Sequence, residues 1–424
     1  MVPKGWKLTS LGEICNGNLQ TGPFGSQLHA HEYVPVGIPV LMPKDLIGCR
    51  AKLADAAKIN QKKAQELKKH FLKTGDLLFS RRGDVARFAL IDEESEGSIC
   101  GTGCLKARPS DKHSSAFLAY FLQKDSIRKW LEQNAVGQTM PNMNTEILNE
   151  LPLMAASSKQ EEDRIAKILS TWDKAIAVTE TLLTNSQLQK KALMQQLLTG
   201  KKRLGLPAGS YEFKITRYGS IPKDWDYPAI KEICTQVNEK NSAAVDHPVL
   251  SCSKYDGFVD SLKYFNKKVY SDDLSGYRLI HRGCFGFPSN HIEEGSIGLQ
   301  NLYDTGIVSP IYVVFRASPT RVDKSYLYAV LKTDHYKQIF GAATNASVDR
   351  RGSLRWKEFN QIHVPLPPLK EQQKIAAVLS AADTEISILE KKLTCLKDEK
   401  KALMQQLLTG KRRVKVEAEE VVSA

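Results

Sequence analysis

The segments ALMQQLLTGKKR, residues 192–203, and ALMQQLLTGKRR, residues 402–413, decide the organisation of this 424-residue chain. Eleven of their twelve residues are identical, at an offset of 210 residues. Chance or shared helix composition does not produce such a match, because many different residues suit an exposed position of a helix. The chain is therefore an internal duplication, and each copy carries this segment near its end.

The similarity extends towards the start of each half. Upstream of the twin segments, residues 165–170, IAKILS, match residues 375–380, IAAVLS, at the same offset. A second match opens each half, where PKGW at residues 3–6 answers PKDW at residues 222–225. Each repeat unit thus consists of a head, a middle segment and a helix.

The two middle segments, residues 16–146 and 235–357, share almost no alignable identity. A conserved frame around divergent middles indicates one scaffold that carries two different recognition surfaces, because function resides in sites placed on a fold. The chain is also too long for a single hydrophobic core, so that more than one domain is expected.

A heptad pattern runs through both repeated helices, with seam residues at alternating spacings of four and three. Ser158 and Glu161 have the spacing of a capping box, Pro367-Pro368 precede the second helix, and Gly200 and Gly410 follow the two helices. Each helix is expected to be roughly 55 Å long. The predicted seam comprises Ile165, Leu169, Trp172, Ile176, Leu183, Leu193 and Leu197 in the first copy, and Ile375, Leu379, Ile386, Leu389, Leu393, Leu396, Leu403 and Leu407 in the second.

A long helix with one apolar stripe needs a partner, and the other copy is the expected one. If the halves are related by a pseudo-two-fold axis, the helices pair antiparallel. The alternative is a long helix that folds onto its own globular domain. Lys190 and Lys400 occupy seam positions, where they either fix the register or mark the ends of tight packing.

Composition narrows the partner class. A net charge of +13 raises the local concentration of polyanions and makes nucleic acid the leading partner. No apolar run approaches the roughly 18 residues that span a bilayer, and residues 1–15 lack the features of a secretory signal. The chain is therefore expected to be cytoplasmic, with no membrane partner. The eight cysteines are scattered without zinc-ligand spacing, so no metal site is expected.

The first middle segment carries polar motifs suited to DNA. A glycine-rich turn occupies residues 20–27, and a strand at residues 75–80 leads into Arg81-Arg82-Gly83. Arginines on such a turn suit phosphates or guanine edges, and a solvated turn is the alternative. A loop of amides at residues 137–144 suits adenine edges or backbone, and a simple loop is the alternative.

The second middle segment has its own polar clusters, at residues 251–255, 282–290 and 345–351, beside a strand-rich core that includes residues 311–315. Most single residues there are expected to be structural. The candidate DNA-contacting residues are Gln20, Thr21, Gly22, Phe24, Ser26, Arg81, Arg82, Arg87 and Asn142 in the first half, and Ser251, Lys254, Tyr255, Arg282, Asn290, Asn345, Arg350 and Arg351 in the second.

Motifs for catalysis are missing from the sequence. It has no Asn/Asp-Pro-Pro-Tyr/Phe tetrapeptide of an amino-methyltransferase, and the glycines at 101 and 103 make too short a cofactor loop. Residues 398–400 have the letters of a nuclease site but lie on the heptad helix, and Gly200-Lys201 lacks the rest of a phosphate-binding loop. No catalytic residue, metal or cofactor is expected in this chain.

Several segments together form a specific pattern: residues 6–13, GPFGS at 22–26, GDLLFSRRGDVAR at 75–87, TMPNMNTEILNELPL at 139–153, VPLPPLKEQQKIAAVL at 364–379 and both QQLLTGK segments. Through these segments the chain resembles, over essentially its whole length, the specificity subunits of type I restriction-modification systems. The second half departs from the pattern, because residues 281–290, HRGCFGFPSN, stand where the first half has its arginine turn, and residues 364–368 are only partly mirrored by residues 151–153.

The resemblance implies an α+β fold in which two α/β target-recognition domains, in pseudo-two-fold arrangement, are separated by two long antiparallel coiled-coil helices. Each domain would read one half of a bipartite site in double-stranded DNA. The paired helices would set the spacing and dock two modification subunits, which carry the methyltransferase chemistry and S-adenosylmethionine. Restriction subunits, a motor and nuclease, would join for cleavage, and this chain itself would be non-catalytic.

The expected boundaries are residues 1–154 for the first recognition domain, 155–204 for the first spacer helix, 205–366 for the second domain, 367–412 for the second helix and 413–424 for a tail. The alternative function is a coiled-coil scaffold that joins partner proteins without reading DNA sequence. A scaffold gives no reason for two divergent domains and a basic charge.

Overall fold

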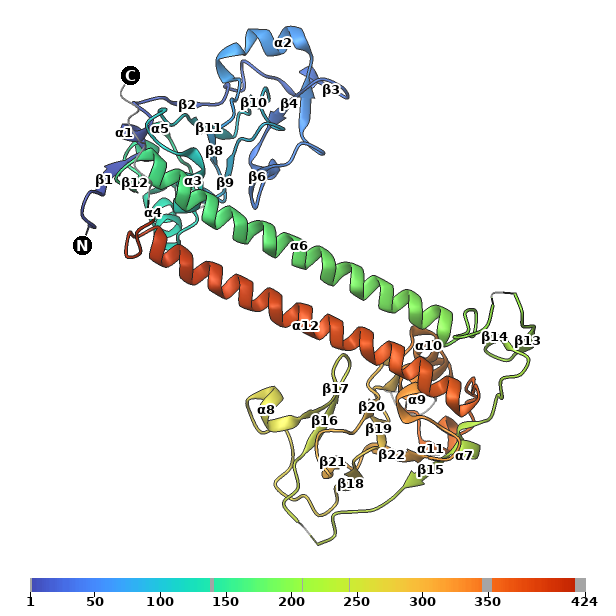
Figure 1. Cartoon of the computed structure of the whole chain (residues 1–424). Helices are drawn as coiled ribbons and strands as arrows, with labels where there is room; N and C mark the ends of the chain where they lie inside the picture. Colours follow the sequence, from blue (N-terminus) through green and yellow to red (C-terminus); the bar gives the residue numbers. More distant parts are fainter. Residues whose placement is uncertain (1, 138–140, 208, 244, 345–352, 416–424) are drawn as a thin grey trace, which may run out of the picture. The chain divides into compact units, whose positions relative to one another are not determined.

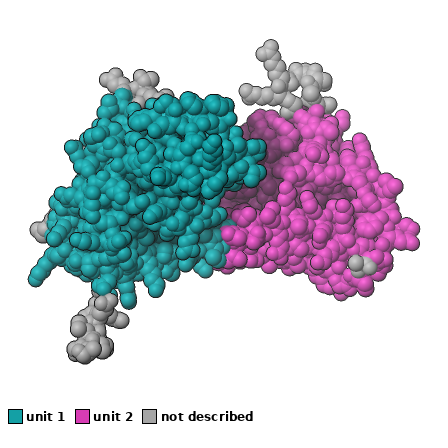
Figure 2. All heavy atoms as spheres, turned by 90° about the horizontal axis from the view of Figure 1, so that it is seen from above, with its two compact units in different colours: residues 1–180, 391–424 teal, residues 181–390 magenta. Residues whose placement is uncertain are grey.

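The computed structural model describes residues 2–137, 141–207, 209–243, 245–344 and 353–415. The chain forms two compact units, shown in different colours in Figure 2. Unit 1 contains residues 1–180 and 391–424, and unit 2 contains residues 181–390. Each unit therefore combines one mixed α/β domain with a part of both long helices.

The mixed domain of unit 1 is built on a six-stranded sheet in the order β2-β11-β8-β9-β6-β5. A four-stranded sheet, β10-β4-β7-β3, and the pair β1-β12 complete it. The elements are β1 Lys7–Ser10, α1 Leu11–Ile14, β2 Leu19–Thr21, η1 Ala30–Glu32, β3 Tyr33–Val34, β4 Ile38–Leu41, η2 Pro43–Asp45, β5 Leu46–Ile47, β6 Cys49–Ala51, β7 Ala57–Ile59, α2 Gln61–Glu66, η3 Lys68–His70, β8 Leu77–Ser80, β9 Phe88–Leu90, β10 Ile99–Cys100, β11 Cys104–Ala107, α3 Ser115–Leu122, α4 Asp125–Asn134, α5 Thr145–Asn149 and β12 Pro152–Ala155, followed by the long helix α6 Lys159–Leu197.

The mixed domain of unit 2 is built on a four-stranded sheet in the order β15-β22-β19-β20, with three further strand pairs, β13-β14, β16-β17 and β18-β21. The elements are β13 Phe213–Thr216, β14 Gly219–Pro222, α7 Ile230–Ile233, β15 Cys234–Val237, β16 Leu250–Ser253, β17 Gly257–Asp260, α8 Ser261–Phe265, β18 Arg278–His281, β19 Phe285–Pro288, η4 Ile292–Glu294, β20 Gly298–Leu299, β21 Thr305–Val308, β22 Tyr312–Ala317, α9 Lys324–Leu331, α10 Asp334–Ala343, α11 Trp356–Phe359 and the long helix α12 Leu369–Leu407.

The two middle segments share one scaffold despite their divergent sequences. The strand order β2-β11-β8-β9 of unit 1 is the order β15-β22-β19-β20 of unit 2, with antiparallel pairing at each step. In both units the last strand of this set along the chain leads into two short helices, α3 and α4 or α9 and α10. The predicted α+β class with two mixed domains and two long helices is confirmed.

Both long helices contain 39 residues, which corresponds to about 58 Å each. They begin in one unit and end in the other, and within each unit they pair antiparallel (Figure 1). In unit 1, Asp173 contacts Lys400 and Glu180 contacts Lys397, so the partner number falls as the helix advances. The expected antiparallel pairing is therefore present inside each unit.

The heptad seam faces the interior along its whole length. Ile165, Leu169 and Leu197 of α6 are buried, as are their counterparts Ile375, Leu379 and Leu407 of α12, and the remaining seam residues are half-buried. Ile165, Leu169 and Leu407 belong to the core of unit 1, whereas the other three belong to the core of unit 2. The ends of each helix thus pack on the mixed domains, while the stretches between them pair with each other.

The two seam lysines fix the register of the helices. Lys190 forms an ion pair with Asp383 in unit 2, and Lys400 forms one with Asp173 in unit 1 at 2.5 Å. Both the lysines and the aspartates are 210 residues apart, so the repeat places the same pair in each unit. A charged pair at one seam position permits one alignment of the helices and penalises others.

Three residues after the last residue of each long helix lies a glycine on which a head segment packs. Gly200 and Gly410 have φ values of +69° and +64°, the left-handed conformation that favours glycine at a helix end. A Cβ atom on Gly200 would lie 2.4 Å from Pro222, and one on Gly410 would lie 2.5 Å from Pro3. The heads recur with the helices because each head closes the end of a helix.

No helix in the described part of the chain is both long enough and apolar enough to cross a membrane.

Candidate nucleic-acid interface

The arginine turn after β8 lies against the amide loop that precedes α5, although the two motifs are far apart in the sequence. Met143 N donates a hydrogen bond to Arg81 O at 2.8 Å, and Arg82 forms an isolated bridge with Asn142. Arg81 Nε and Asn142 Oδ1 are buried without a hydrogen-bond partner among the described residues. Two of the predicted motifs therefore form one local structure, in which these two buried polar atoms still require a hydrogen-bond partner.

The glycine-rich turn meets the same end of the sheet. Gly22 N donates to Cys104 O at 2.9 Å and Arg81 N donates to Gly103 O at 2.8 Å, so the two turns flank the start of β11. A Cβ atom on Gly22 would lie 1.8 Å from Gly101 O, and only glycine permits this approach. Three predicted motifs of the first half thus converge at the start of β11.

The side chains of this turn differ in what they offer to a ligand. Gln20 and Thr21 are half-buried in β2, whereas Phe24 and Ser26 are exposed. Phe24 N donates to Gln27 Oε1 at 3.1 Å, which holds the turn while the Phe24 ring faces solvent. An exposed aromatic ring on a held turn is suited to contact a base or a sugar.

The two exposed arginines differ in how far their guanidinium groups are bonded within the domain. Arg82 is exposed and has no carboxylate within ion-pair distance among the described residues. Arg87 donates to Pro43 O at 3.1 Å and lies 3.7 Å from Asp84, so part of its guanidinium is used within the domain. Arg82 is thus the cation of the cluster that is most available to a phosphate or a guanine edge.

Two further basic residues lie buried in unit 1. Lys106 Nζ donates to Lys69 O at 3.0 Å and to Phe71 O at 3.4 Å, and burial lowers its pKa. Burial, followed by the charges of Lys69 and Lys106, lowers the pKa of His70 to about 4. His70 is therefore neutral at pH 7. Sequence reasoning missed both residues, because their burial depends on how β11 and η3 pack in the folded domain.

In unit 2 a different turn occupies the place of the arginine turn. Ser289 N donates to Ile311 O at 3.2 Å, and Leu354 N donates to Ser289 O at 2.7 Å. These are the same two bonds that hold Arg81 in unit 1. Ser289 and the half-buried Asn290 thus present a hydroxyl and an amide where the first domain presents guanidinium groups.

Arg282, the predicted cation of the second half, lies before β19 rather than after it. Arg282 Nε donates to Asp304 at 3.0 Å, so its charge is paired within the domain. The comparable residues of HRGCFGFPSN are therefore the last two, and Arg282 does not belong to the turn. Three further candidates, Asn345, Arg350 and Arg351, lie outside the described residues.

The hairpin of β16 and β17 carries the other candidates of unit 2. Ser251 Oγ shares a hydrogen bond of 2.7 Å with Ser261 Oγ, and this bond serves the fold. Lys254 and Tyr255 stand exposed at the tip, with Lys254 Nζ 5.6 Å from the centre of the Tyr255 ring.

Three side chains beside the second turn could offer metal ligands. His291, Glu293 and Glu294 place their ligand atoms within 4.8 Å of one another, and they are the one such group within the described part of the chain. They are exposed or half-exposed, and no further observation indicates an ion there.

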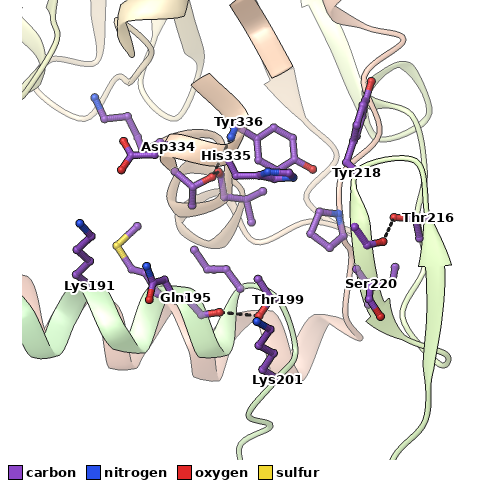
Figure 3. Close-up of a pocket in the computed structure, with 18 of the residues that line it drawn as sticks. Lys191, Gln195, Thr199, Lys201, Thr216, Tyr218, Ser220, Asp334, His335 and Tyr336 are labelled. Carbon is purple, nitrogen blue, oxygen red and sulfur yellow. Dashed lines mark hydrogen bonds between the residues drawn. The ribbon is translucent and has the colours of Figure 1, made fainter. Parts of the chain in front are cut away.

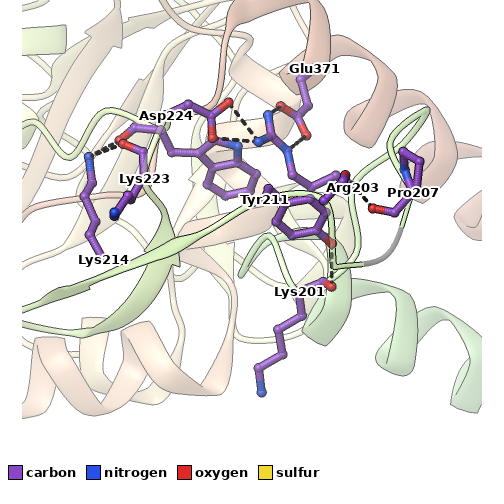
Figure 4. Close-up of polar contacts among 10 residues, drawn as sticks. Lys201, Arg203, Pro207, Tyr211, Lys214, Lys223, Asp224 and Glu371 are labelled. Atoms are coloured by element: carbon purple, nitrogen blue, oxygen red, sulfur yellow. Dashed lines mark hydrogen bonds and ion pairs between the residues drawn. The ribbon is translucent and has the colours of Figure 1, made fainter.

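An arginine network closes the end of α6 in unit 2 (Figure 4). Arg203 donates to Glu371 at 2.6 and 2.9 Å and to Asp224 at 2.6 and 2.8 Å, beside the rings of Tyr211 and Trp225. The hydrogen bonds to Glu371, and then those to Asp224, raise the pKa of Arg203 above its usual range. One buried guanidinium thus joins the end of α6, the start of α12 and the head of the second domain.

Unit 1 repeats this network with Arg413. Its guanidinium donates to Glu161 at 2.7 and 3.0 Å, to Lys4 O at 2.7 Å and to Ser157 Oγ at 2.9 Å. Arg413 and Arg203, like Glu161 and Glu371, are 210 residues apart. Sequence reasoning missed these pairs, although their shared offset was a signal that could have found them.

A groove of about 800 Å³ lies in unit 2 between the end of α6, the β13-β14 hairpin and the start of α10 (Figure 3). Lys191 and Lys201 come from the helix side, Tyr218 from the hairpin and His335 from α10. None of the candidate DNA-contacting residues lines it. The groove is thus separate from the candidate interface.

Comparison with known proteins agrees with the geometry of both units. The chain matches the family described as type I restriction modification DNA specificity domain at residues 3–186 and 222–398, more than half of its length. It is 23% identical to the putative type I restriction enzyme MjaX specificity subunit of Methanocaldococcus jannaschii, over 98% of this chain and 95% of that protein. It is 27% identical to the MjaVIII specificity subunit of the same organism, over 70% of each chain.

Two solved structures share the fold. The type I restriction-modification S subunit from M. genitalium has a TM-score of 0.57 at 15% identity, over 95% of this chain and 96% of that one. The HsdS subunit from Thermoanaerobacter tengcongensis has a TM-score of 0.50 at 17% identity, over 97% and 98%. With its two family matches, its duplicated frame and a polar turn at the same place in each domain, the chain belongs to the DNA specificity family of type I restriction-modification systems, and its function is DNA target recognition.

Proposed function

We propose that each mixed domain reads one half of a bipartite site in double-stranded DNA, through the turn that follows β8 in unit 1 and β19 in unit 2. The observation that supports this most strongly is that Arg81 in unit 1 and Ser289 in unit 2 each make an equivalent pair of backbone hydrogen bonds. One scaffold position carries two arginines in the first domain and a serine and an asparagine in the second. Different side chains at one place of a common frame are what two different half-sites require.

In unit 1 the proposed contacts are the exposed side chains of Arg82 and Phe24. Arg81 and Asn142, which have buried polar atoms, support the turn that carries Arg82. Arg82 suits a guanine edge or a phosphate, and the exposed ring of Phe24 suits a base or a sugar. In unit 2 the proposed contacts are Asn290 and the hairpin residues Lys254 and Tyr255. The amide of Asn290 suits an adenine edge. The scaffold alternative is not favoured, because the family reads DNA.

The long helices are proposed to set the spacing of the half-sites and to dock two modification subunits. Each helix is about 58 Å long, longer than the roughly 34 Å pitch of duplex DNA. We propose that the partners, and not this chain, carry the methyltransferase site and S-adenosylmethionine, and that restriction subunits join for cleavage. The chain would thus act without catalysis, in the cytoplasm with its DNA and its partners.

The proposed division of the chain follows the repeat. Residues 1–154 and 205–366 are the recognition domains, residues 155–204 and 367–412 contain the spacer helices, and residues 413–424 form the tail. The helix bounds Lys159–Leu197 and Leu369–Leu407 lie within the proposed spacers.

The experiment that tests the proposal uses the chain assembled with its modification subunits. A library of random duplexes is incubated with the complex and S-adenosylmethionine, and the methylated bases are located by sequencing. The expected result is one bipartite sequence with a constant gap. Methylation without sequence preference, or at one uninterrupted site, would contradict the proposal.

A further inference from the structure

The tip of the β16-β17 hairpin exposes an aromatic ring that the fold does not need. Tyr255 is 81% exposed, more than any other aromatic side chain within the described part of the chain. Its hydroxyl takes part in none of the hydrogen bonds of the tip. Burial of aromatic surface is favourable, so a ring held in solvent is available to a ligand.

The turn at this tip is held by side-chain hydrogen bonds and by a glycine in the left-handed conformation. Ser253 Oγ accepts from the backbone N–H groups of Tyr255 and Asp256 at 3.3 Å each, and it donates to Asp256 Oδ2 at 3.0 Å. Tyr264 Oη donates to the same carboxylate at 3.2 Å. Gly257 has φ +71°, and a Cβ atom there would lie 2.8 Å from Tyr328 Oη. A turn fixed in this way presents its side chain with little loss of conformational entropy on binding.

A lysine ties the tip to the second recognition turn. Lys332 Nζ donates to Lys254 O at 2.8 Å and to Gly295 O at 2.9 Å. Gly295 directly follows η4, which begins two residues after Asn290. Lys332 therefore connects the tip to the segment that follows the Ser289-Asn290 turn.

The surroundings of the ring favour a nucleobase. Lys254 lies beside the ring and has no carboxylate within ion-pair distance in the described part of the chain. An exposed aromatic ring can stack on a base while a neighbouring cation contacts the adjacent phosphate. A protein partner would be expected to use the neighbouring exposed residues of α8 as well, among them Leu262.

We propose that Tyr255 stacks on a base of the second half-site and opens the base step there. The second domain would then read how easily the DNA deforms, in addition to the base edges that its polar turn contacts. This inference rests on the proposed function, because it requires that the second domain binds a half-site.

The test compares Tyr255→Ala, Tyr255→Phe and the control Leu262→Ala in the chain assembled with modification subunits. The affinity for a duplex with the selected site is measured, and 2-aminopurine is placed at each position of the second half-site. The inference predicts that Tyr255→Ala weakens binding roughly 5- to 150-fold and abolishes a fluorescence rise at one position. Tyr255→Phe and Leu262→Ala should retain both signals.

Three results would overturn the inference. Unchanged affinity and fluorescence in Tyr255→Ala would show that the ring does not stack. A failure of assembly shared by Tyr255→Ala and Leu262→Ala would assign the tip to a protein partner. Absence of sequence selection by the unaltered complex would refute the proposed function as well, and this separates its failure from that of the inference alone.

Discussion

The two units use equivalent ion pairs between the long helices but differ in how the mixed domain is fixed to them. In unit 1, Asp173 accepts from Lys400 at 2.5 Å and also from Tyr120 Oη of α3 at 2.6 Å. In unit 2, Ala329 of α9 takes the place of the tyrosine, and the Asp383 side chain is 59% exposed compared with 38% for that of Asp173. The repeat thus preserves the helix pair and lets each domain attach in its own way.

A second difference lies at the start of each long helix. Glu162 is fully buried and accepts from Ser114 N at 2.8 Å and Ala156 N at 3.2 Å, and His113 Nδ1 lies 3.2 Å from the same carboxylate. Its counterpart Gln372 is also fully buried, but its amide donates to Arg321 O at 3.0 Å and Pro367 O at 2.8 Å. An ionised carboxylate can only accept hydrogen bonds, whereas a side-chain amide both accepts and donates them. The same position therefore makes domain-specific bonds.

The largest expected effect comes from exchanging these two residues. Gln372→Glu would place a buried carboxylate against two carbonyl oxygens and should destabilise unit 2 by about 3–5 kcal/mol. The matched change Glu162→Gln leaves one side-chain oxygen for the two backbone donors and puts an amide group in place of the other oxygen, which should cost unit 1 about 1–3 kcal/mol. Hydrogen exchange of each unit measures both effects. Equal losses in the two units would show that the difference in bonding carries no weight.

The arginine networks should give the next effect. Arg203→Met leaves Glu371 and Asp224 without their shared cation, at an expected cost of about 2–4 kcal/mol in unit 2. Arg413→Met should cost about 1–2 kcal/mol, because the Arg413 side chain is 44% exposed and that of Arg203 is 5% exposed. Urea unfolding followed by hydrogen exchange resolves the two. A larger loss from Arg413→Met would reverse this ranking.

Acid should weaken unit 1 more than unit 2 through buried histidines. His70 is buried in unit 1, whereas no histidine is buried in the described part of unit 2. The pKa of His70 is lowered from 6.5 to about 4, so the unfolded chain binds this proton first as the pH falls. The stabilisation is complete above about pH 6.5 and is lost towards pH 4, up to about 3 kcal/mol. His70→Gln should flatten this part of the pH profile. An unchanged profile would mean that His70 is not the group that titrates.

The smallest effect concerns the extra bond of unit 1. Tyr120→Phe removes one hydrogen bond to a carboxylate and should cost about 1 kcal/mol. Burial, and then the bond to Asp173, raise the pKa of Tyr120 above its usual range, so the hydroxyl remains a donor at neutral pH. A double-mutant cycle with Lys400→Met measures the coupling through Asp173. Strict additivity would show that the two donors act independently.

The sequence predicted the parts of this fold that the repeat makes visible. The twin helices, their seam and the heads could be found because equal segments recur at fixed offsets. The partners of Lys190 and Lys400 could not be assigned, although Asp173 and Asp383 stood in step, because the antiparallel register is a property of packing. Each ion pair joins a lysine near the end of one helix to an aspartate of the facing helix, and the sequence alone does not show which residues face each other.

The candidate interface was predictable as motifs and not as an arrangement. The arginine turn and the amide loop each stood out, but their contact depends on strand pairing between segments without internal similarity. In the second half the search for a cation selected Arg282, which precedes β19, whereas the equivalent turn carries Ser289 and Asn290. A polar turn without charge gives no compositional signal.

We propose that each unit reads its own half-site. Methylation sequencing of random duplexes tests this with two variants of the assembled complex, Arg82→Ala and Asn290→Ala. Arg82→Ala should relax the preference at positions of one half-site by roughly 5- to 150-fold and leave the other unchanged. Asn290→Ala should do the reverse. If either variant relaxes both half-sites, or if both variants affect the same one, the two units do not read separate half-sites.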